Sequence, residues 1–192
     1  SRSKRAPRLA NIGSRINPAY LEAFIEDPHV TKPGTTMPDA LPQSGKPLRK
    51  EVATALTQFL LSRQGNDFSL NPPDAVAAAH GFNLFHSKGC AQCHSPRDST
   101  GKERGFENSV PLGALDRKYN HKGLTEFLLH PHSTRPSGRM PDLRLTHQEA
   151  NRIAHYLLQD IRVPGVLEYT LYRGQVWEGI ESENVRAERA GH

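Results

Sequence analysis

The chain has 192 residues, of which 35% are hydrophobic, and it contains 15 glycines and 15 prolines. This length allows one large domain or two small ones, and the composition favours small helical units joined by irregular loops over one large core. No apolar stretch is long enough to predict a transmembrane segment, and no apolar signal-peptide segment follows the basic first residues.

The formal net charge of +5 arises in the first 50 residues, which hold nine Lys or Arg and four Asp or Glu. Four of these cations lie near the beginning of the chain: Arg2, Lys4, Arg5 and Arg8. Such a segment is either a solvated end or a contact surface for an acidic partner or an anionic membrane. No aromatic residues interleave with the charges, so we expect no nucleic-acid binding.

Residues 63–74 are rich in Gly, Asn and Pro and read as a linker. Pro73 and Asp74 then open a stretch of strong helix formers that contains Phe82 and Phe85. The spacing predicts a helix over residues 75–85.

Cys90, Cys93 and His94 form a C-x-x-C-H motif, the attachment signature of c-type haem. Two thiols three residues apart can each add to one vinyl group of a porphyrin, and the next residue then ligates the iron. A zinc site would need four ligands, but the chain has no other cysteines. A thioredoxin-like redox pair would need a strand before the motif, where the pattern predicts a helix.

Met140 lies in a loop whose shape is fixed by neighbouring prolines and a glycine. A thioether suits the sixth position of low-spin iron, so Met140 is the predicted distal ligand, although a packing role is the alternative. His121, His130 and His132 are rival ligands, but each is expected to be a surface histidine.

Thr146 and Glu149 form a capping box that precedes a helical apolar stripe ending near Asp160. Residues 75–162 are therefore predicted to form a complete mainly α domain. Together with the attachment motif and the Met loop, this stretch resembles class I cytochromes c over its whole length. The resemblance implies one-electron transfer through haem c.

The resemblance also implies particular contacts. Gly81 and Phe85 would meet Tyr156 where the first and last helices of the domain cross. The carbonyl of Pro111 would accept a hydrogen bond from the His94 ring, as a proline does in this family.

The chain repeats itself at an offset of 103 residues. Between residues 21 and 39 nine positions of nineteen are identical to those 103 residues later: Leu21, Phe24, Pro28, His29, Thr31, Pro33, Met37, Pro38 and Asp39. Residues 51–61 resemble the closing helix, and Pro7 resembles Pro111 after a shift of one. Residues 1–62 are therefore expected to be the C-terminal half of a first cytochrome c domain.

This first unit has a Met37 loop but no attachment motif. Three explanations are open: the motif lies upstream in a longer precursor, it has been lost, or a cleaved companion segment carries it. We favour the first or third, because Met37 has a clear purpose only as a ligand of a second haem.

Residues 163–192 first alternate between apolar and polar side chains and then become highly charged. This pattern predicts a short β-like extension or the start of a following β domain. A cytochrome followed by such a segment resembles planctomycete-type multidomain proteins, in which a carbohydrate-binding module follows.

The sequence therefore predicts an electron carrier rather than an enzyme, in a periplasmic or otherwise exported compartment because covalent haem is installed there. The alternatives are a two-haem peroxidase-like enzyme and a redox module fused to a recognition protein. The expected partner is a redox protein, possibly an acidic one.

Overall fold

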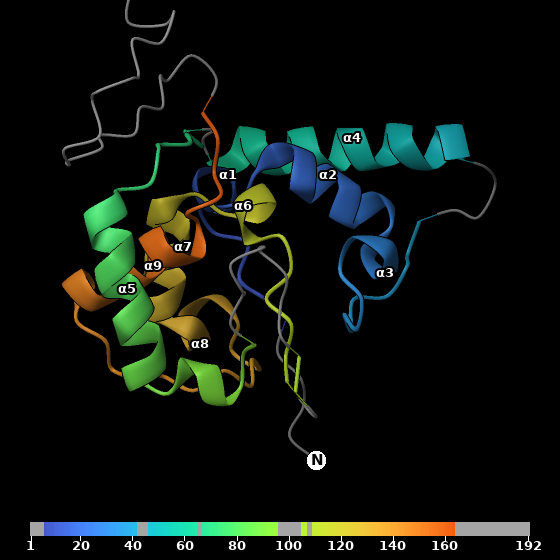
Figure 1. Cartoon of the computed structure of the whole chain (residues 1–192). Helices are drawn as coiled ribbons and strands as arrows, with labels where there is room; N and C mark the ends of the chain where they lie inside the picture. The colour runs from blue at the N-terminus through green and yellow to red at the C-terminus, as the bar shows by residue number, and fades with distance from the viewer. Residues whose placement is uncertain (1–5, 42–45, 65–66, 96–104, 107–108, 164–192) are drawn as a thin grey trace, which may run out of the picture.

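The computed structural model describes residues 6–41, 46–64, 67–95, 105–106 and 109–163 (Figure 1). Regular structure in these ranges is helical, with one isolated antiparallel bridge between Ile16 and Tyr119. The elements are α1 (Ile12–Arg15), α2 (Pro18–Glu26), α3 (Pro28–Thr31), α4 (Lys46–Gln64), α5 (Ala75–Ser87), the 3-10 helix η1 (Cys90–Gln92), α6 (Leu115–Lys118), α7 (His121–Leu129), α8 (Pro131–Thr134) and α9 (His147–Leu157). The predicted mainly α class is confirmed. The β-like extension falls, apart from residue 163, outside the described residues.

The crossing of α5 and α9 organises the C-terminal half, where the two helices lie side by side (Figure 1). Gly81 is buried at the crossing, and a Cβ at this position would lie 2.6 Å from the carbonyl carbon of Arg152 and 2.9 Å from the Cβ of Tyr156. The rings of Phe85 and Tyr156 pack edge to face with centroids 5.5 Å apart. The expected contact of the first and last helices of this domain is thus present.

Both helices begin where the sequence predicts. The side chain of Asp74 caps α5 by accepting a hydrogen bond from the backbone N–H of Ala77 at 2.8 Å. Thr146 and Glu149 form the reciprocal capping box at the start of α9. Lys88, at the end of α5, makes an ion pair of 2.7 Å with Glu149, which ties the two helix ends together.

The repeat is visible in the element boundaries. α1, α2 and α3 each begin and end 103 residues before α6, α7 and α8. The turns after α3 and α8 also correspond: the N–H of Thr35 donates to the carbonyl of Lys32 at 3.1 Å, and the N–H of Gly138 donates to that of Arg135 at 2.8 Å. α4 packs on α2 as α9 packs on α7.

The two halves meet through equivalent residues. Ile16 and Tyr119, which form the β-bridge, are 103 residues apart. Arg15 lies against Gly123, and the Nζ of Lys118 lies 5.4 Å from the ring centroid of Tyr20, which is the reciprocal contact in the repeat. Such reciprocity is typical of a two-fold interface.

Buried residues of α1, α2, α5, α7 and α9 belong to a common hydrophobic cluster in the described part of the chain. Buried residues from both stretches, 1–62 and 75–162, therefore contribute to one cluster. Among the described helices, none is both long and apolar enough to cross a lipid bilayer.

Candidate functional site

The C-x-x-C-H motif forms a tight turn directly after α5. Gly89 adopts a left-handed conformation with φ of 82°, which lets the chain reverse into η1 without a Cβ clash. The N–H groups of Cys93 and His94 both donate to the carbonyl of Cys90, at 3.1 and 2.9 Å. The two cysteines form no disulfide bond. The turn therefore presents the two thiols and the imidazole from one short segment.

The imidazole of His94 is oriented by a backbone carbonyl. Its Nδ1 lies 3.0 Å from the carbonyl oxygen of Val110. An Nδ1–H that donates to this oxygen leaves Nε2 as the nitrogen available to a metal.

The acceptor corrects the expectation, which assigned this role to Pro111. The N–H of Val110 donates to the carbonyl of Cys93 at 2.8 Å, so Val110 is paired with the motif through both of its backbone groups. Pro111 has no N–H with which to make such a pair, and its side chain is exposed. Its ring restricts the preceding residue to extended conformations, which is how it contributes to the position of the Val110 carbonyl.

Met140 lies on the loop between α8 and α9, whose backbone is fixed at both ends. Before it, the turn at Arg135 is closed by Gly138. After it, the carboxylate of Asp142 accepts a hydrogen bond from the N–H of Arg144 at 2.9 Å. Met140 itself is half-buried and packs against the core. These hydrogen bonds fix the backbone on both sides of Met140, and the side chain packs on the core.

The three segments of the candidate site share an apolar setting. Cys90, Ala91, Leu112 and Met140 all pack, partly buried, against the same hydrophobic cluster. Burial is the largest cause that raises the pKa of the Cys90 thiol. The set of two thiols, an oriented imidazole, a thioether and an apolar lining fits a covalently attached haem.

Ser95 was missed by sequence reasoning. The residue is 1% exposed, and its buried hydroxyl has no hydrogen-bond partner among the described residues. A buried polar atom without a partner is unusual, and this one directly follows the motif. Its position directly after His94 in the motif is the only signal that the sequence offered.

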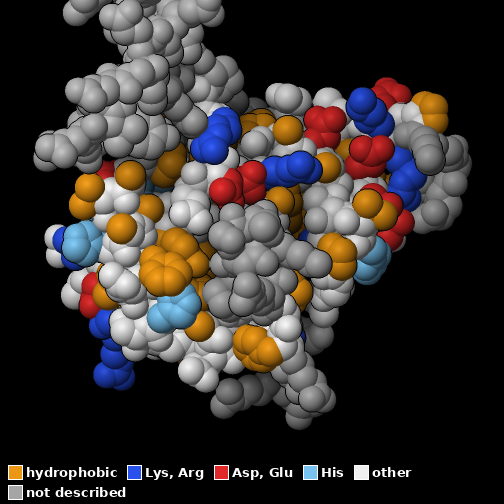
Figure 2. All heavy atoms as spheres, viewed as in Figure 1, with side chains coloured by type: hydrophobic (Ala, Val, Ile, Leu, Met, Phe, Trp, Pro, Cys, Tyr) orange, Lys and Arg blue, Asp and Glu red, His pale blue; other side chains and the backbone are white. Residues whose placement is uncertain are grey.

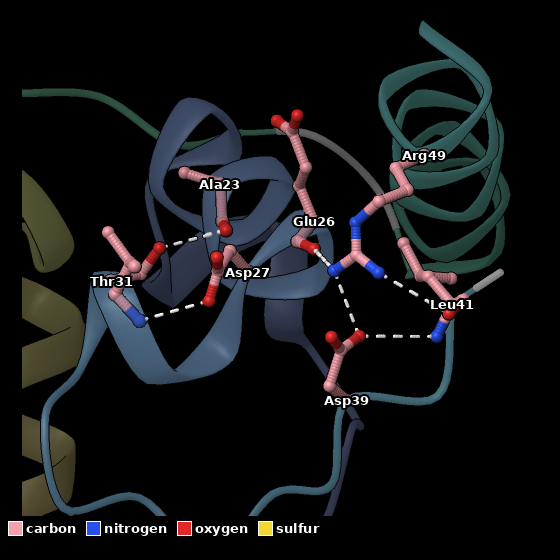
Figure 3. Close-up of polar contacts among 8 residues, drawn as sticks. Ala23, Glu26, Asp27, Thr31, Asp39, Leu41 and Arg49 are labelled. Atoms are coloured by element: carbon pink, nitrogen blue, oxygen red, sulfur yellow. Dashed lines mark hydrogen bonds and ion pairs between the residues drawn. The ribbon is translucent and has the colours of Figure 1, made fainter. Parts of the chain in front are cut away.

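The Met37 loop has its own anchoring (Figure 3). Arg49 of α4 makes an ion pair of 2.9 Å with Asp39 and also donates to the backbone carbonyls of Glu26 and Leu41. Asp39 accepts from the N–H of Leu41 at 3.4 Å, which repeats the turn of Asp142 and Arg144. Met37 is half-buried. The two methionine loops are thus built alike.

The rival histidines differ from one another. His130 and His132 are exposed, as expected. His121 is only 8% exposed, so the expectation of a surface histidine was wrong for this residue. Its ring packs on that of His155 with centroids 4.2 Å apart, because α7 and α9 pack together there. Burial, and then the charge of His155, lower the pKa of His121 to about 4.

Comparison with known proteins supports this interpretation of the site. Residues 78–160 match the family model described as cytochrome c. The match supports a class I cytochrome c domain in this part of the chain, with covalently bound haem c and a role in electron transfer. No curated protein matches the chain, and no solved structure does.

Proposed function

We propose that the protein is a one-electron carrier in which Cys90 and Cys93 hold haem c, while His94 and Met140 are the axial ligands. The observation that carries the proposal is the hydrogen bond between His94 Nδ1 and the carbonyl of Val110, which leaves Nε2 as the nitrogen available to the iron. Bound haem supplies the iron couple that takes up and releases the electron. The chain supplies the attachment, the ring orientation and the apolar setting.

Replacement of Met140 by Ala tests the distal ligand. The ferric wild type should show the weak far-red charge-transfer band of sulfur bound to iron, and Met140→Ala should lose it. The control is His132→Ala, which removes an exposed side chain eight residues before Met140. This variant should keep the band. Absence of the band in the wild type, or its survival in Met140→Ala, would contradict the assignment.

Two protein ligands would also distinguish a carrier from a haem enzyme. With both axial positions held by the chain, peroxide or carbon monoxide has no open position to bind. Rapid, stoichiometric binding of carbon monoxide by the untreated reduced protein would favour the peroxidase-like alternative.

We further propose that residues 1–62 belong to a second haem unit in which Met37 is the distal ligand. The repeated element boundaries and the matching turns around the two methionines support this proposal. Cys90 and Cys93 are the only cysteines of the chain, so the attachment motif for this haem would come from a further segment.

The exposed face of α4 indicates what that segment would look like. The buried residues Ala53 and Thr57 of α4 match the buried Ala150 and Ala154 of α9 at an offset of 97, because the loop before α4 is six residues longer than its counterpart. In this alignment Leu56 and Phe59 of α4 occupy the places of Ile153 and Tyr156 of α9. Leu56 is 42% exposed and Phe59 is 58% exposed, whereas Ile153 is 0% exposed where α9 meets α5. The segment would therefore be a helix like α5, followed by a second C-x-x-C-H, in the same polypeptide or in a companion.

Haem quantitation tests this second proposal. We expect two haems per protein as isolated from its source, and a loss of one sulfur-to-iron band in Met37→Ala. One haem per protein, with spectra unchanged by Met37→Ala, would leave Met37 as a packing residue only.

The setting follows from the same chemistry. Attachment of haem c outside the cytoplasm places the protein in the periplasm or an equivalent exported compartment, and its partner is a redox protein. Hydrophobic side chains lie at the surface on the side where α5 is drawn (Figures 1 and 2), and Phe82 of α5 is 48% exposed. Exposed apolar groups there would suit a brief encounter with the partner.

A further inference from the structure

Four cations meet where the two halves of the molecule join. They form two pairs of repeat-equivalent residues, each pair 103 residues apart, and are called the junction cluster here: Arg15 with Lys118, and Lys32 with Arg135. All four are half-buried. The β-bridge between Ile16 and Tyr119 lies beside the first pair. The repeat therefore brings like charges together instead of opposite ones.

Aromatic rings contact two of these cations, Lys118 and Arg135. The Nζ of Lys118 lies 4.8 Å from the ring centroid of Tyr119 and 5.4 Å from that of Tyr20. A guanidinium nitrogen of Arg135 is 3.4 Å from the hydroxyl of Tyr119, and its Cζ lies 5.2 Å from the ring centroid of Phe127. Tyr119 thus contacts a lysine through its ring and an arginine through its hydroxyl.

Among the described residues, no carboxylate makes a direct ion pair with a junction cation. The ion pairs there are Arg49–Asp39 and Lys88–Glu149, neither of which includes a junction cation. Arg15 is bound instead to the backbone carbonyls of Arg8 and Ala10. Glu126 faces Arg15, but without a direct ion pair.

The electrostatic consequence is mutual repulsion. Burial, and then the charges of Arg135, Lys32 and Arg15, lower the pKa of Lys118 to about 6. Burial and Arg135 also lower the pKa of Lys32. Half-buried cations without counter-charges are costly and are seldom kept without a partner.

We propose that the junction cluster is an oxyanion-binding site that takes a group with two negative charges. Guanidinium and ammonium donors converging beside a tyrosine hydroxyl suit paired carboxylates or a dianion. Such a group has two sources: the two carboxylates of a bound haem, in which case the site rests on the proposed function, or a free dianion from solution. By bridging residues of both halves, it would fix them against each other.

The test uses the full haem-loaded chain and compares Lys118→Met with Lys122→Met. Lys122 is an exposed lysine on α7, so both variants lose the same charge, while Lys118→Arg keeps it. Measurements below pH 6, where Lys118 is protonated, are of two kinds. The first is the thermal midpoint in low millimolar sulfate against chloride at equal ionic strength. The second is the reduction potential without sulfate.

Two outcomes support the site and identify its source. The first outcome identifies a free dianion: sulfate raises the thermal midpoint of the wild type, of Lys122→Met and of Lys118→Arg, but not that of Lys118→Met. A lower reduction potential in Lys118→Met alone, without any sulfate effect, identifies haem carboxylates, because removal of a nearby positive charge favours the oxidised form.

If Lys118→Met matches Lys122→Met in both measurements, the proposal is wrong. Lys32→Met, which removes a charge of the junction cluster that comes from the other half, provides the same comparison should Lys118→Met not fold. The sulfate measurement does not depend on the axial ligands, and the Met140→Ala spectra do not depend on the junction cluster. Failure of one proposal is therefore distinguishable from failure of the other.

Discussion

Substitution of Gly81 by Ala probes the contact on which the C-terminal half depends. An added Cβ would clash with the carbonyl of Arg152 and approach the Cβ of Tyr156 to 2.9 Å, inside the separation that real Cβ atoms keep. The obstacle is backbone, so the helices α5 and α9 must separate. Overpacking of this kind costs about 1–3 kcal/mol, occasionally more. Alanine is favoured over glycine within a helix by about 1 kcal/mol, which offsets only part of this cost.

We therefore expect Gly81→Ala to lower the free energy of unfolding by about 2 kcal/mol, or the thermal midpoint by roughly 4–8 °C for a chain of this size. Urea unfolding followed by helical circular dichroism measures the change. Ala79→Gly, at an exposed position of the same helix, isolates helix propensity and should cost about 1 kcal/mol. If Gly81→Ala is as stable as the wild type or more so, the close crossing of α5 and α9 does not hold.

Three further predictions concern charge. The hydrogen bond from Lys88, and then that from the N–H of Thr146, lower the pKa of Glu149 to about 2. The ionised carboxylate should therefore stabilise the fold fully above about pH 4.5 and lose this effect as the pH falls toward 2. Glu149→Gln should flatten the dependence of the unfolding free energy on pH in this acid range. His121 resists protonation in the folded state, so stability should fall between about pH 6.5 and 4, and His121→Gln should reduce that fall in thermal midpoints measured across this range. Serine at the four basic N-terminal positions should slow reduction by an acidic partner and flatten its dependence on salt without changing the thermal midpoint; an unchanged salt slope in stopped-flow measurements would speak against a role in encounter.

The sequence alone predicted those features that are formed by residues close together in the chain. The spacing of Cys90, Cys93 and His94 indicates haem attachment because the three groups come from one turn. The caps at Asp74 and Thr146 mark helix starts because the side chain bonds backbone groups only three residues away. Small size at Gly81 indicated a close helix crossing, and the structure provides one.

Tertiary structure decided what depends on distant partners. The sequence could not show that Val110 rather than Pro111 would face His94, since that register is set by a hydrogen bond to Cys93 seventeen residues earlier. The burial of His121 depends on α9 arriving beside α7, although a polar residue at a helix start ordinarily faces water. Local patterns report which face of an element is apolar, but not which other element will cover it.

The repeat lies between these two cases. Comparison of the chain with itself predicts two similar halves, and the matching bounds of α1–α3 and α6–α8 agree with that reading. How the halves meet was not predictable, because the contact joins Ile16 to Tyr119 and Arg15 to Gly123 over about a hundred residues. The approach of like charges at this junction follows from packing geometry. Lys118 and Arg135 of the C-terminal half already lie around Tyr119, and the docking of the two halves adds the charges of Arg15 and Lys32.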